Sequence, residues 1–167
     1  SVSIFFRKNL IFSESIRIGG QHITSDIMQA FQISYSAAER LKVLHGGLMS
    51  TNSDDRETIE LPENNADLYT DRRTITKSEL LGVIRPRVEE IFDSLRTILD
   101  NSDFEFLPGQ KIVLTGGGSK LANLLDFTSN FLGKSTRVAV PMRIQGLPTS
   151  AHGPEAAAII GLALNLA

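Results

Sequence analysis

The stretch VLTGGGSK, residues 113–120, decides the fold that the sequence predicts. A β-branched strand pattern over residues 111–115 runs into Gly116, Gly117 and Gly118, and a helix is predicted immediately afterwards. Glycines leave the backbone open to close approach by a flat ligand, and the N-terminus of the following helix presents free N–H groups and a positive partial charge to a phosphate. A turn of this kind therefore favours binding of a flat or phosphorylated ligand. The spacing matches neither the P-loop nor the dinucleotide fingerprint. Two interpretations stay open: a ligand-binding turn, or a tight turn that only needs glycine conformations.

Outward from this stretch, strand and helix patterns alternate along the chain. Strands are predicted at residues 2–6, 10–18, 57–61, 111–115 and 136–140. Helices are predicted at residues 22–32, 36–45, 76–99 and 154–166. Thr76 and Glu79 form a capping-box pattern at the start of the third helix, and Pro86 inside it predicts a kink or one lost hydrogen bond. Turns are expected at residues 62–65 and 108–109. This interleaving predicts an α/β fold.

Length and composition narrow the class of protein. The 167 residues are 41% hydrophobic and 22% charged, which is typical of a globular protein with a sizeable core. Seventeen Lys and Arg residues against 19 Asp and Glu give a net charge of −2, which argues against a nucleic-acid partner. The absence of cysteine excludes disulfides, thiolate metal sites and a cysteine nucleophile. The longest nearly apolar run, residues 156–167, is shorter than the roughly 20 residues of a membrane-spanning helix.

Glu39 and Lys42 form a second candidate binding feature. They lie three residues apart on a predicted helix and therefore share one face, where they can offer an acceptor and a donor to a polar ligand. Alternatively, Ser36 and Glu39 form a capping box, and Glu39 then serves only the start of its own helix. His22, His45 and His152 are scattered without metal-ligand spacing, so a zinc site is not expected.

Basic residues concentrate before and within the long predicted helix. They are Arg72, Arg73, Lys77, Arg85 and Arg87. Such a cluster in a slightly acidic chain is able to receive an acidic peptide tail. The alternative is a solvated helix face, on which the arginines pair with Glu79, Glu89 and Glu90.

Taken in order, these segments resemble a known family. The matching stretches are residues 18–27 (IGGQHITSDI), residues 38–42 (AERLK) with His45-Gly46, residues 84–87 (IRPR), the glycine triplet and the final helix from Gly153-Pro154. Together they resemble the FtsA family of bacterial cell-division proteins, which belongs to the actin-like ATPase superfamily. Residues 47–71 match poorly. The alternatives from other classes are a lobe of a chaperone-type or sugar-kinase-type actin-like ATPase and an interaction module without nucleotide binding.

The resemblance implies an architecture and a cofactor. The fold would be the ribonuclease H-like core lobe of an actin-like ATPase with a smaller inserted α/β subdomain. Residues 1–20 and 108–167 would form the core subdomain IIA around one mixed sheet, and residues 21–107 the inserted subdomain IIB. ATP, with Mg²⁺ in the complete protein, would bind between them. The implied contacts are Gly116, Gly117, Gly118 and Lys120 from the core subdomain, and Glu39 and Lys42 from the inserted one.

The resemblance also implies partners and a cellular place. The C-terminal tail of the tubulin-like protein FtsZ would dock on Arg73, Arg85, Arg87 and Glu90. Self-association into actin-like filaments and contacts with other division proteins are expected, in the cytoplasm at the inner face of the membrane at the division site. Membrane attachment would come only from segments outside this sequence. Both the phosphate loop expected before Ser1 and the opposite half of the fold would be needed for hydrolysis, so this lobe alone is not expected to hydrolyse ATP.

Overall fold

The computed structural model describes residues 1–49, 54–61, 73–102, 110–142 and 152–165. The chain forms two compact units, Ser1–Leu107 and Pro108–Ala167, each with its own internal packing. The turns expected at residues 62–65 and 108–109 lie outside the described residues. The division of the chain into subdomains at residues 20 and 107 remains a prediction.

The first unit begins with a β-hairpin. Strands β1 (Val2–Phe6) and β2 (Asn9–Glu14) pair antiparallel, joined by Arg7 and Lys8. Both joining residues have positive φ, 48° and 71°, as expected in the primed turns that match the twist of a hairpin. The predicted second strand was too long, because the register ends at the pair Val2 and Glu14 and leaves residues 15–18 without a partner on β1.

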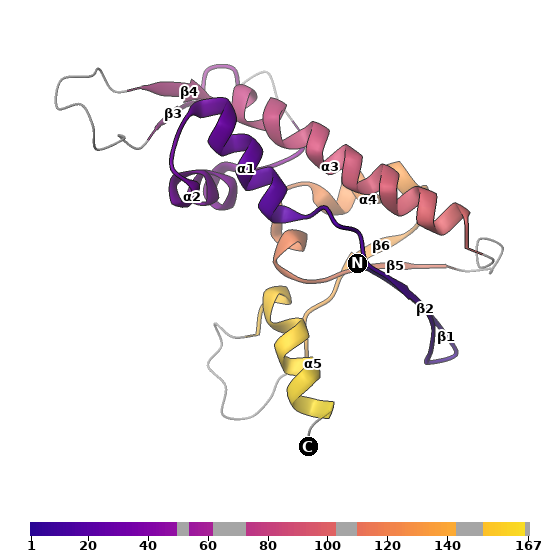
Figure 1. Cartoon of the computed structure of the whole chain (residues 1–167). Helices are drawn as coiled ribbons and strands as arrows, with labels where there is room; N and C mark the ends of the chain where they lie inside the picture. The colour runs from indigo at the N-terminus through magenta and orange to yellow at the C-terminus, as the bar shows by residue number, and fades with distance from the viewer. Residues whose placement is uncertain (50–53, 62–72, 103–109, 143–151, 166–167) are drawn as a thin grey trace. The chain divides into compact units, whose positions relative to one another are not determined.

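Three helices form the core of the first unit. Helix α1 (Gly20–Phe31) packs against both α2 (Tyr35–His45) and α3 (Lys77–Asp100) (Figure 1). The side chains of Ile27, Leu80 and Ile84 are completely buried at these contacts. Leu80 and Ile84 lie four residues apart on α3, which is the spacing of one face of an amphipathic helix. The apolar pattern of the sequence and the packing therefore agree.

Local side-chain signals set the start of α3. The Thr76 hydroxyl accepts a hydrogen bond from the backbone N–H of Glu79, and the Glu79 carboxylate accepts one from the N–H of Thr76. This is the predicted capping box, and it is confirmed. The helix continues through Pro86, which has no N–H to donate to the preceding turn.

A short antiparallel pair completes the first unit. Strand β3 (Thr58–Glu60) pairs with β4 (Thr74–Thr76), and Ile59 and Ile75 are buried opposite one another. The prediction found β3 but missed β4. The described strands form three separate two-stranded sheets, so the single mixed sheet that the resemblance implies is not among their pairings.

The second unit is built around a parallel strand pair. Strands β5 (Ile112–Leu114) and β6 (Thr136–Val138) flank the 3-10 helix η1 (Gly117–Lys120) and helix α4 (Leu124–Leu132). The prediction of a helix directly after the glycines was therefore inexact. Asn123, with φ 64°, separates η1 from α4.

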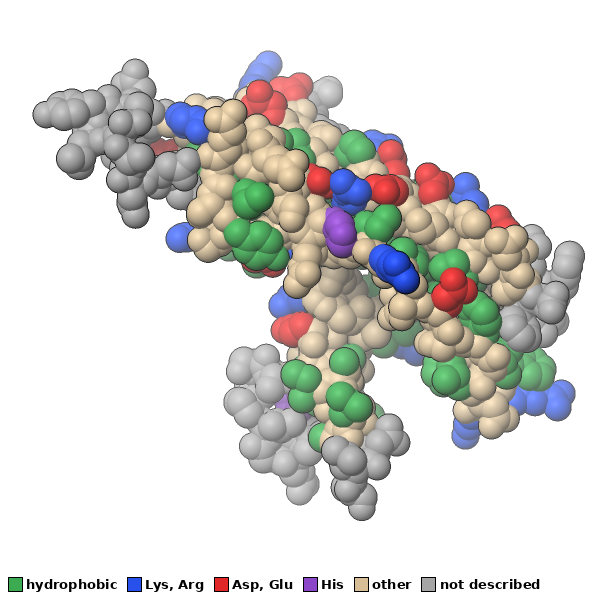
Figure 2. All heavy atoms as spheres, viewed as in Figure 1, with side chains coloured by type: hydrophobic (Ala, Val, Ile, Leu, Met, Phe, Trp, Pro, Cys, Tyr) green, Lys and Arg blue, Asp and Glu red, His purple; other side chains and the backbone are tan. Residues whose placement is uncertain are grey.

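The chain's last described element is a helix with an exposed apolar face. The 3-10 helix η3 (Pro154–Ala156) leads into α5 (Ala157–Asn165), as the Pro154 signal predicted. Hydrophobic side chains gather on α5 in Figure 2. Two residues of this helix, Ile159 and Leu162, are 72% and 66% exposed. No helix among the residues described is long and apolar enough to cross a membrane.

Candidate functional site

Glu39 and Lys42 form one ion pair on α2, and α1 supports it. The Lys42 Nζ lies 2.6 Å from Glu39 Oε2, 2.8 Å from the Thr24 hydroxyl and 3.1 Å from the carbonyl oxygen of Gly20. Thr24 donates to the same Glu39 oxygen at 2.5 Å. The predicted acceptor and donor therefore lie side by side, fixed by contacts to the first two turns of α1.

The start of α2 resolves one alternative from the sequence. Ser34, not Ser36, caps the helix, and its hydroxyl accepts a hydrogen bond from the N–H of Ala37. The interpretation of Ser36 and Glu39 as a capping box is therefore wrong. Glu39 lies in the second turn and binds Thr24 and Lys42 instead.

The environment of Glu39 favours its ionised form. Burial on its own raises the pKa of the carboxyl group, but hydrogen bonds from Lys42 and Thr24 outweigh it and hold the pKa below the usual value. Both hydrogen bonds go to Oε2. Within the described part of the chain, Oε1 accepts none, and the side chain is 41% exposed. A negatively charged acceptor is thus available to a ligand hydroxyl.

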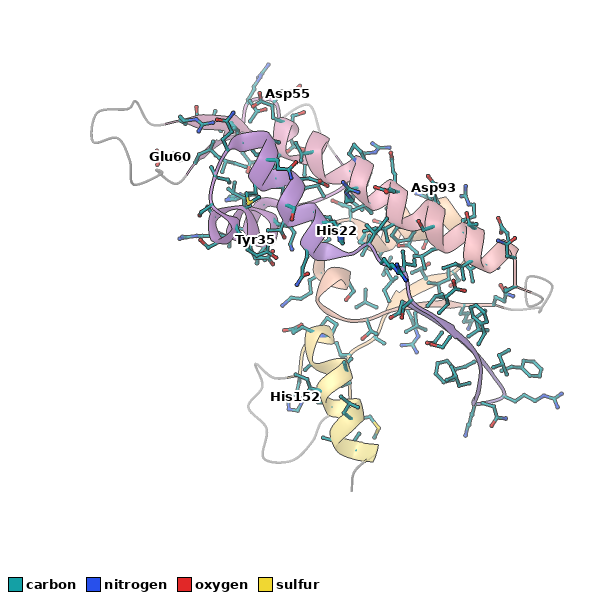
Figure 3. The ribbon with its side chains drawn as sticks, in the orientation of Figure 1. His22, Tyr35, Asp55, Glu60, Asp93 and His152 are labelled. Carbon is teal, nitrogen blue, oxygen red and sulfur yellow. The ribbon has the colours of Figure 1, made fainter. Side chains whose placement is uncertain are left out.

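Acidification is expected to weaken the tie between α1 and α2. Because the pKa of Glu39 is lowered in the folded chain, its contribution to stability is complete above the unfolded pKa of about 4.3 and is lost as the pH falls through the folded value. A Glu39→Gln variant should therefore lose less thermal stability on acidification than the unchanged chain. Thermal unfolding at a series of pH values tests this, with Asp93→Asn on the exposed face of α3 as control (Figure 3). Equal pH dependence of the unchanged chain and Glu39→Gln contradicts it.

The glycine turn of the second unit has a conformation that only glycine adopts readily. Gly116 has φ 82° and ψ 170°, and its N–H donates to the carbonyl oxygen of Pro154 at 2.9 Å. Its own carbonyl accepts hydrogen bonds from the backbone N–H and the hydroxyl of Ser119. The turn is therefore tied to the start of the final helix through η3.

An acidic side chain lies beside this turn. A Cβ atom on Gly117 would meet the Cβ of Glu155 at 3.8 Å. Lys120 Nζ lies 3.3 Å from the Glu155 carboxylate. A hydrogen bond from its own backbone N–H and the nearby Lys120 lower the pKa of Glu155. Lys120 therefore has an anionic partner within the unit, and an anionic ligand would compete with that partner.

The predicted docking arginines each have an intramolecular partner. Arg73 donates to the carbonyl oxygen of Phe31 at the end of α1, and Arg85 pairs with Glu89 one turn along α3. Arg87 donates two hydrogen bonds to Asp26 on α1, at 2.6 and 2.9 Å, and a third to Glu90. The bond to Asp26, opposed by partial burial, raises the pKa of Arg87. Arg85 is more accessible than Arg87, with 58% of its side chain exposed against 27%.

Three residues at these sites escaped the sequence analysis. Thr24 joins Glu39 to Lys42, Asp26 holds Arg87, and Glu155 holds Lys120. The contacts of Thr24 and Asp26 link residues 15 to 61 positions apart, and sequence periodicity does not report such pairings. The spacing of Thr24 and Asp26 was the one available signal. Two residues two positions apart on a helix project from opposite sides, so they can contact different neighbouring elements.

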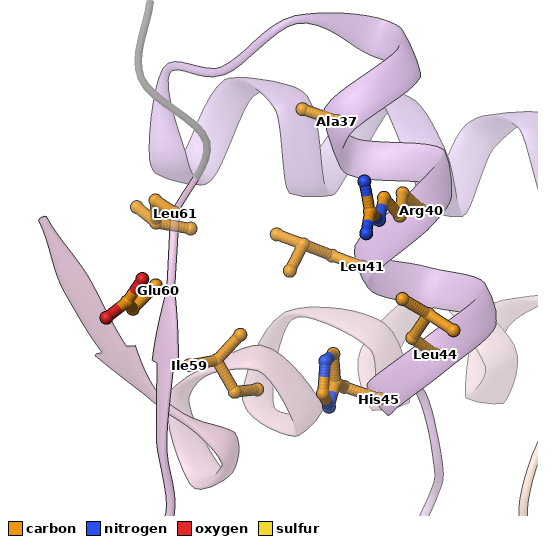
Figure 4. Close-up of a pocket in the computed structure, with 8 residues that line it drawn as sticks. All are labelled: Ala37, Arg40, Leu41, Leu44, His45, Ile59, Glu60 and Leu61. Carbon is orange, nitrogen blue, oxygen red and sulfur yellow. The ribbon is translucent and has the colours of Figure 1, made fainter.

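A groove lies on a different flank of α2 from Glu39 and Lys42. It has a volume of about 310 Å³ and separates α2 from β3 (Figure 4). Its lining residues are Ala37, Arg40, Leu41, Leu44, His45, Ile59, Glu60 and Leu61. None of the predicted nucleotide contacts lines it.

His22 lies at the start of α1, where its Nδ1 accepts a hydrogen bond from the N–H of Gly19 (Figure 3).

Comparison with known proteins gives this chain a family. The profile of the family described as "Cell division protein FtsA" matches residues 1–161, nearly the whole chain. The chain belongs to the FtsA family. The FtsA of Agrobacterium fabrum is 32% identical over 162 residues, which cover 97% of this chain and 37% of that protein. The FtsA of Pseudomonas aeruginosa is 28% identical, with 96% and 38% coverage. The chain thus spans somewhat more than a third of the length of these FtsA relatives.

Solved structures place this FtsA chain in the actin-like fold. MreB5 of Spiroplasma citri bound to ADP superposes with a TM-score of 0.65 at 20% identity, covering 78% of this chain and 42% of that one. The same protein bound to AMPPNP matches equally well, with a TM-score of 0.65. The ethanolamine utilization protein EutJ of Carboxydothermus hydrogenoformans covers 95% of this chain and 44% of its own, with a TM-score of 0.57 at 17% identity. The expected actin-like α/β fold is confirmed.

Proposed function

We propose that this chain is the ATP-binding and partner-binding lobe of an FtsA protein that tethers FtsZ filaments to the cytoplasmic membrane. The observation that carries the proposal is the family match over residues 1–161, combined with the fixed Glu39–Lys42 pair. In this proposal the lobe supplies the adenosine side of the nucleotide site. Filament formation, other division proteins and a place at the inner face of the membrane belong to the whole protein.

The residues on the first unit fit the ribose and base of ATP. Glu39 has one carboxylate oxygen held by Lys42 and Thr24 and a second that is open within the described residues, which suits a pair of ribose hydroxyls. Lys42 supplies a cation beside that acceptor. The bound ADP and AMPPNP of the MreB5 structures support the choice of a nucleotide for this fold.

The glycine turn of the second unit fits close approach by a nucleotide. A Cβ on Gly118 or Gly116 would meet no atom within 4 Å, so there is open space on that side of the backbone at both positions. We assign Gly116, Gly117 and Gly118 to the α-phosphate and adenine, with Lys120 as a further cation. In this proposal, the residues that bind Mg²⁺ and the remaining phosphate-binding loops belong to the rest of the protein.

The nucleotide site is tested by a Gly117→Asp substitution in the whole protein that carries this chain. The new carboxylate would stand beside Glu155 and repel the phosphates, so ATP affinity should fall at least about tenfold. Gly82→Asp is the control, since it adds the same charge to an exposed glycine of α3. ATP titration by calorimetry measures both variants. Equal affinity of Gly117→Asp and the unchanged protein, or no binding by the unchanged protein, contradicts the assignment.

The FtsZ tail is assigned to α3 and its neighbourhood. Arg85, Arg73 and Arg87 supply positive charge, and the side chain of Arg85 is more open to an incoming carboxylate than that of Arg87. The contact would be charge-assisted, salt-sensitive and of modest affinity. An acidic tail would have to compete with Asp26 and Glu90 for Arg87, so Arg87 is the weakest member of the docking surface.

A further inference from the structure

Thr24 lies at the centre of the contact between α1 and α2. Its side chain is completely buried, and its hydroxyl has three polar neighbours: Glu39 Oε2 at 2.5 Å, Lys42 Nζ at 2.8 Å and the carbonyl oxygen of Gly20 at 3.0 Å. A buried hydroxyl without hydrogen bonds destabilises a fold, so these contacts satisfy Thr24. They also join it to both charged residues of the candidate site.

The chemistry of the hydroxyl group assigns a direction to each bond. The ammonium of Lys42 has only donors, so Thr24 accepts from it. The single hydroxyl proton then has two possible acceptors, and the shorter contact is to the ionised carboxylate of Glu39. Charge-assisted hydrogen bonds are the stronger kind, so this contact dominates. Thr24 therefore stabilises the carboxylate and the ammonium at the same time.

Two donors on one oxygen fix the orientation of the Glu39 carboxylate. Lys42 and Thr24 both bind Oε2, and Oε1 carries no hydrogen bond within the described residues. An unrestrained glutamate would rotate among several conformers, and a ligand would have to select one of them. Restraining the group before binding removes that cost.

We infer that Thr24 is a positioning residue of the nucleotide site: its buried hydroxyl holds Glu39 and Lys42 in the arrangement that receives a ribose. Thr24 itself is completely buried, so in this inference it acts through the pair and not by touching the ligand. The inference rests on the proposed ATP-binding function. On the first unit it adds a third residue to Glu39 and Lys42, which the family resemblance supplied.

ATP titration of the whole protein that carries this chain tests the inference. Thr24→Val keeps the shape of the side chain and removes the hydroxyl, so ATP should bind about three- to tenfold more weakly. Thr24→Ser keeps the hydroxyl and should bind within about twofold of the unchanged protein. The control is Thr128→Val, because Thr128 is equally buried but its hydroxyl, as far as the described residues go, bonds only the carbonyl oxygen of Leu124, at 2.7 Å. This control should leave ATP affinity unchanged.

A Glu39→Ala background shows whether Thr24 acts through the carboxylate. In that background Thr24→Val should weaken ATP binding by a smaller factor than it does in the unchanged protein. The inference alone is overturned if the unchanged protein binds ATP and Thr24→Val binds equally well, or if Thr24→Ser loses as much affinity as Thr24→Val. If the unchanged protein binds no ATP, the proposed function fails and the inference falls with it.

A second measurement keeps the inference testable if Thr24→Val does not fold. In the unchanged protein, NMR should detect the hydroxyl proton of Thr24 and the ammonium protons of Lys42, protected from exchange by their hydrogen bonds. Both should remain visible when ATP is bound. Their disappearance on addition of ATP would show that the pair rearranges, and would overturn the inference.

Discussion

Replacing Gly116 by alanine is expected to reduce the free energy of unfolding by about 2–3 kcal/mol and to weaken ATP binding in the whole protein. The physical reason is the backbone. With φ 82° and ψ 170°, Gly116 occupies a region that residues with a Cβ avoid, so an alanine must distort the turn. The distortion would break the hydrogen bond from the Gly116 N–H to Pro154 and shift the neighbouring amides.

Gly118→Ala is the matched control for this prediction. It lies two residues away in the same turn, its φ is not positive, and an added Cβ would likewise meet no atom within 4 Å. The two variants add the same methyl group to open space and differ only in the backbone conformation that must accommodate it. Chemical denaturation measures the stability of both variants, and ATP titration compares Gly116→Ala with the unchanged protein. Equal stability of Gly116→Ala and Gly118→Ala would show that the turn does not hold the conformation described.

Arg87→Glu is expected to destabilise the first unit by roughly 2–3 kcal/mol, whether or not a partner peptide is present. Arg87 donates two hydrogen bonds to Asp26 across the α1–α3 contact, and both side chains are about a quarter exposed, 27% and 25%. Reversal of the charge would place a carboxylate between Asp26 and Glu90. Thermal or urea unfolding measures the effect. An Arg87→Glu chain as stable as the unchanged one would mean that the pair contributes nothing.

Arg85→Glu separates docking from stability. Arg85 is more exposed, and its partner among the described residues is Glu89 on its own helix, so its reversal should cost less than about 1 kcal/mol of stability. Binding of an FtsZ-tail peptide should nevertheless fall about fivefold at low salt, with a smaller loss at high salt. Arg137→Glu on β6 is the control for net charge. Equal peptide affinity of Arg85→Glu and Arg137→Glu would remove Arg85 from the docking surface.

Helix positions were predictable because short-range side-chain signals set them. The Thr76 and Glu79 capping box and the glycine after His45 predicted the start of α3 and the end of α2 correctly. Strand β4 was missed because three residues carry too little periodicity, and its antiparallel pairing with β3, centred on Ile75 and Ile59, is what defines it. The helix after the glycine turn was predicted to begin too early, because Asn123 interrupts it in a left-handed conformation.

The candidate site was predictable only in part. Helical spacing was enough to place Glu39 and Lys42 together, and their ion pair is 2.6 Å long. The sequence offered no sign that Thr24 on another helix completes this pair, because a threonine in an amphipathic helix fits many roles. Likewise, the charge of Arg87 was visible in the sequence, but its neutralisation by Asp26 depends on how α1 and α3 pack.

Two residues of α1 at nearly the same position along its axis make polar contacts with two different helices. Thr24 holds α2, and Asp26, two residues later, holds α3. At a rise of about 1.5 Å per residue these anchors are separated by only about 3 Å along the axis, with no flexible joint between them. A small rotation or translation of α1 relative to α2 must therefore change the lengths of its hydrogen bonds to α3 as well. The positions of α2 and α3 are in this way coupled through α1.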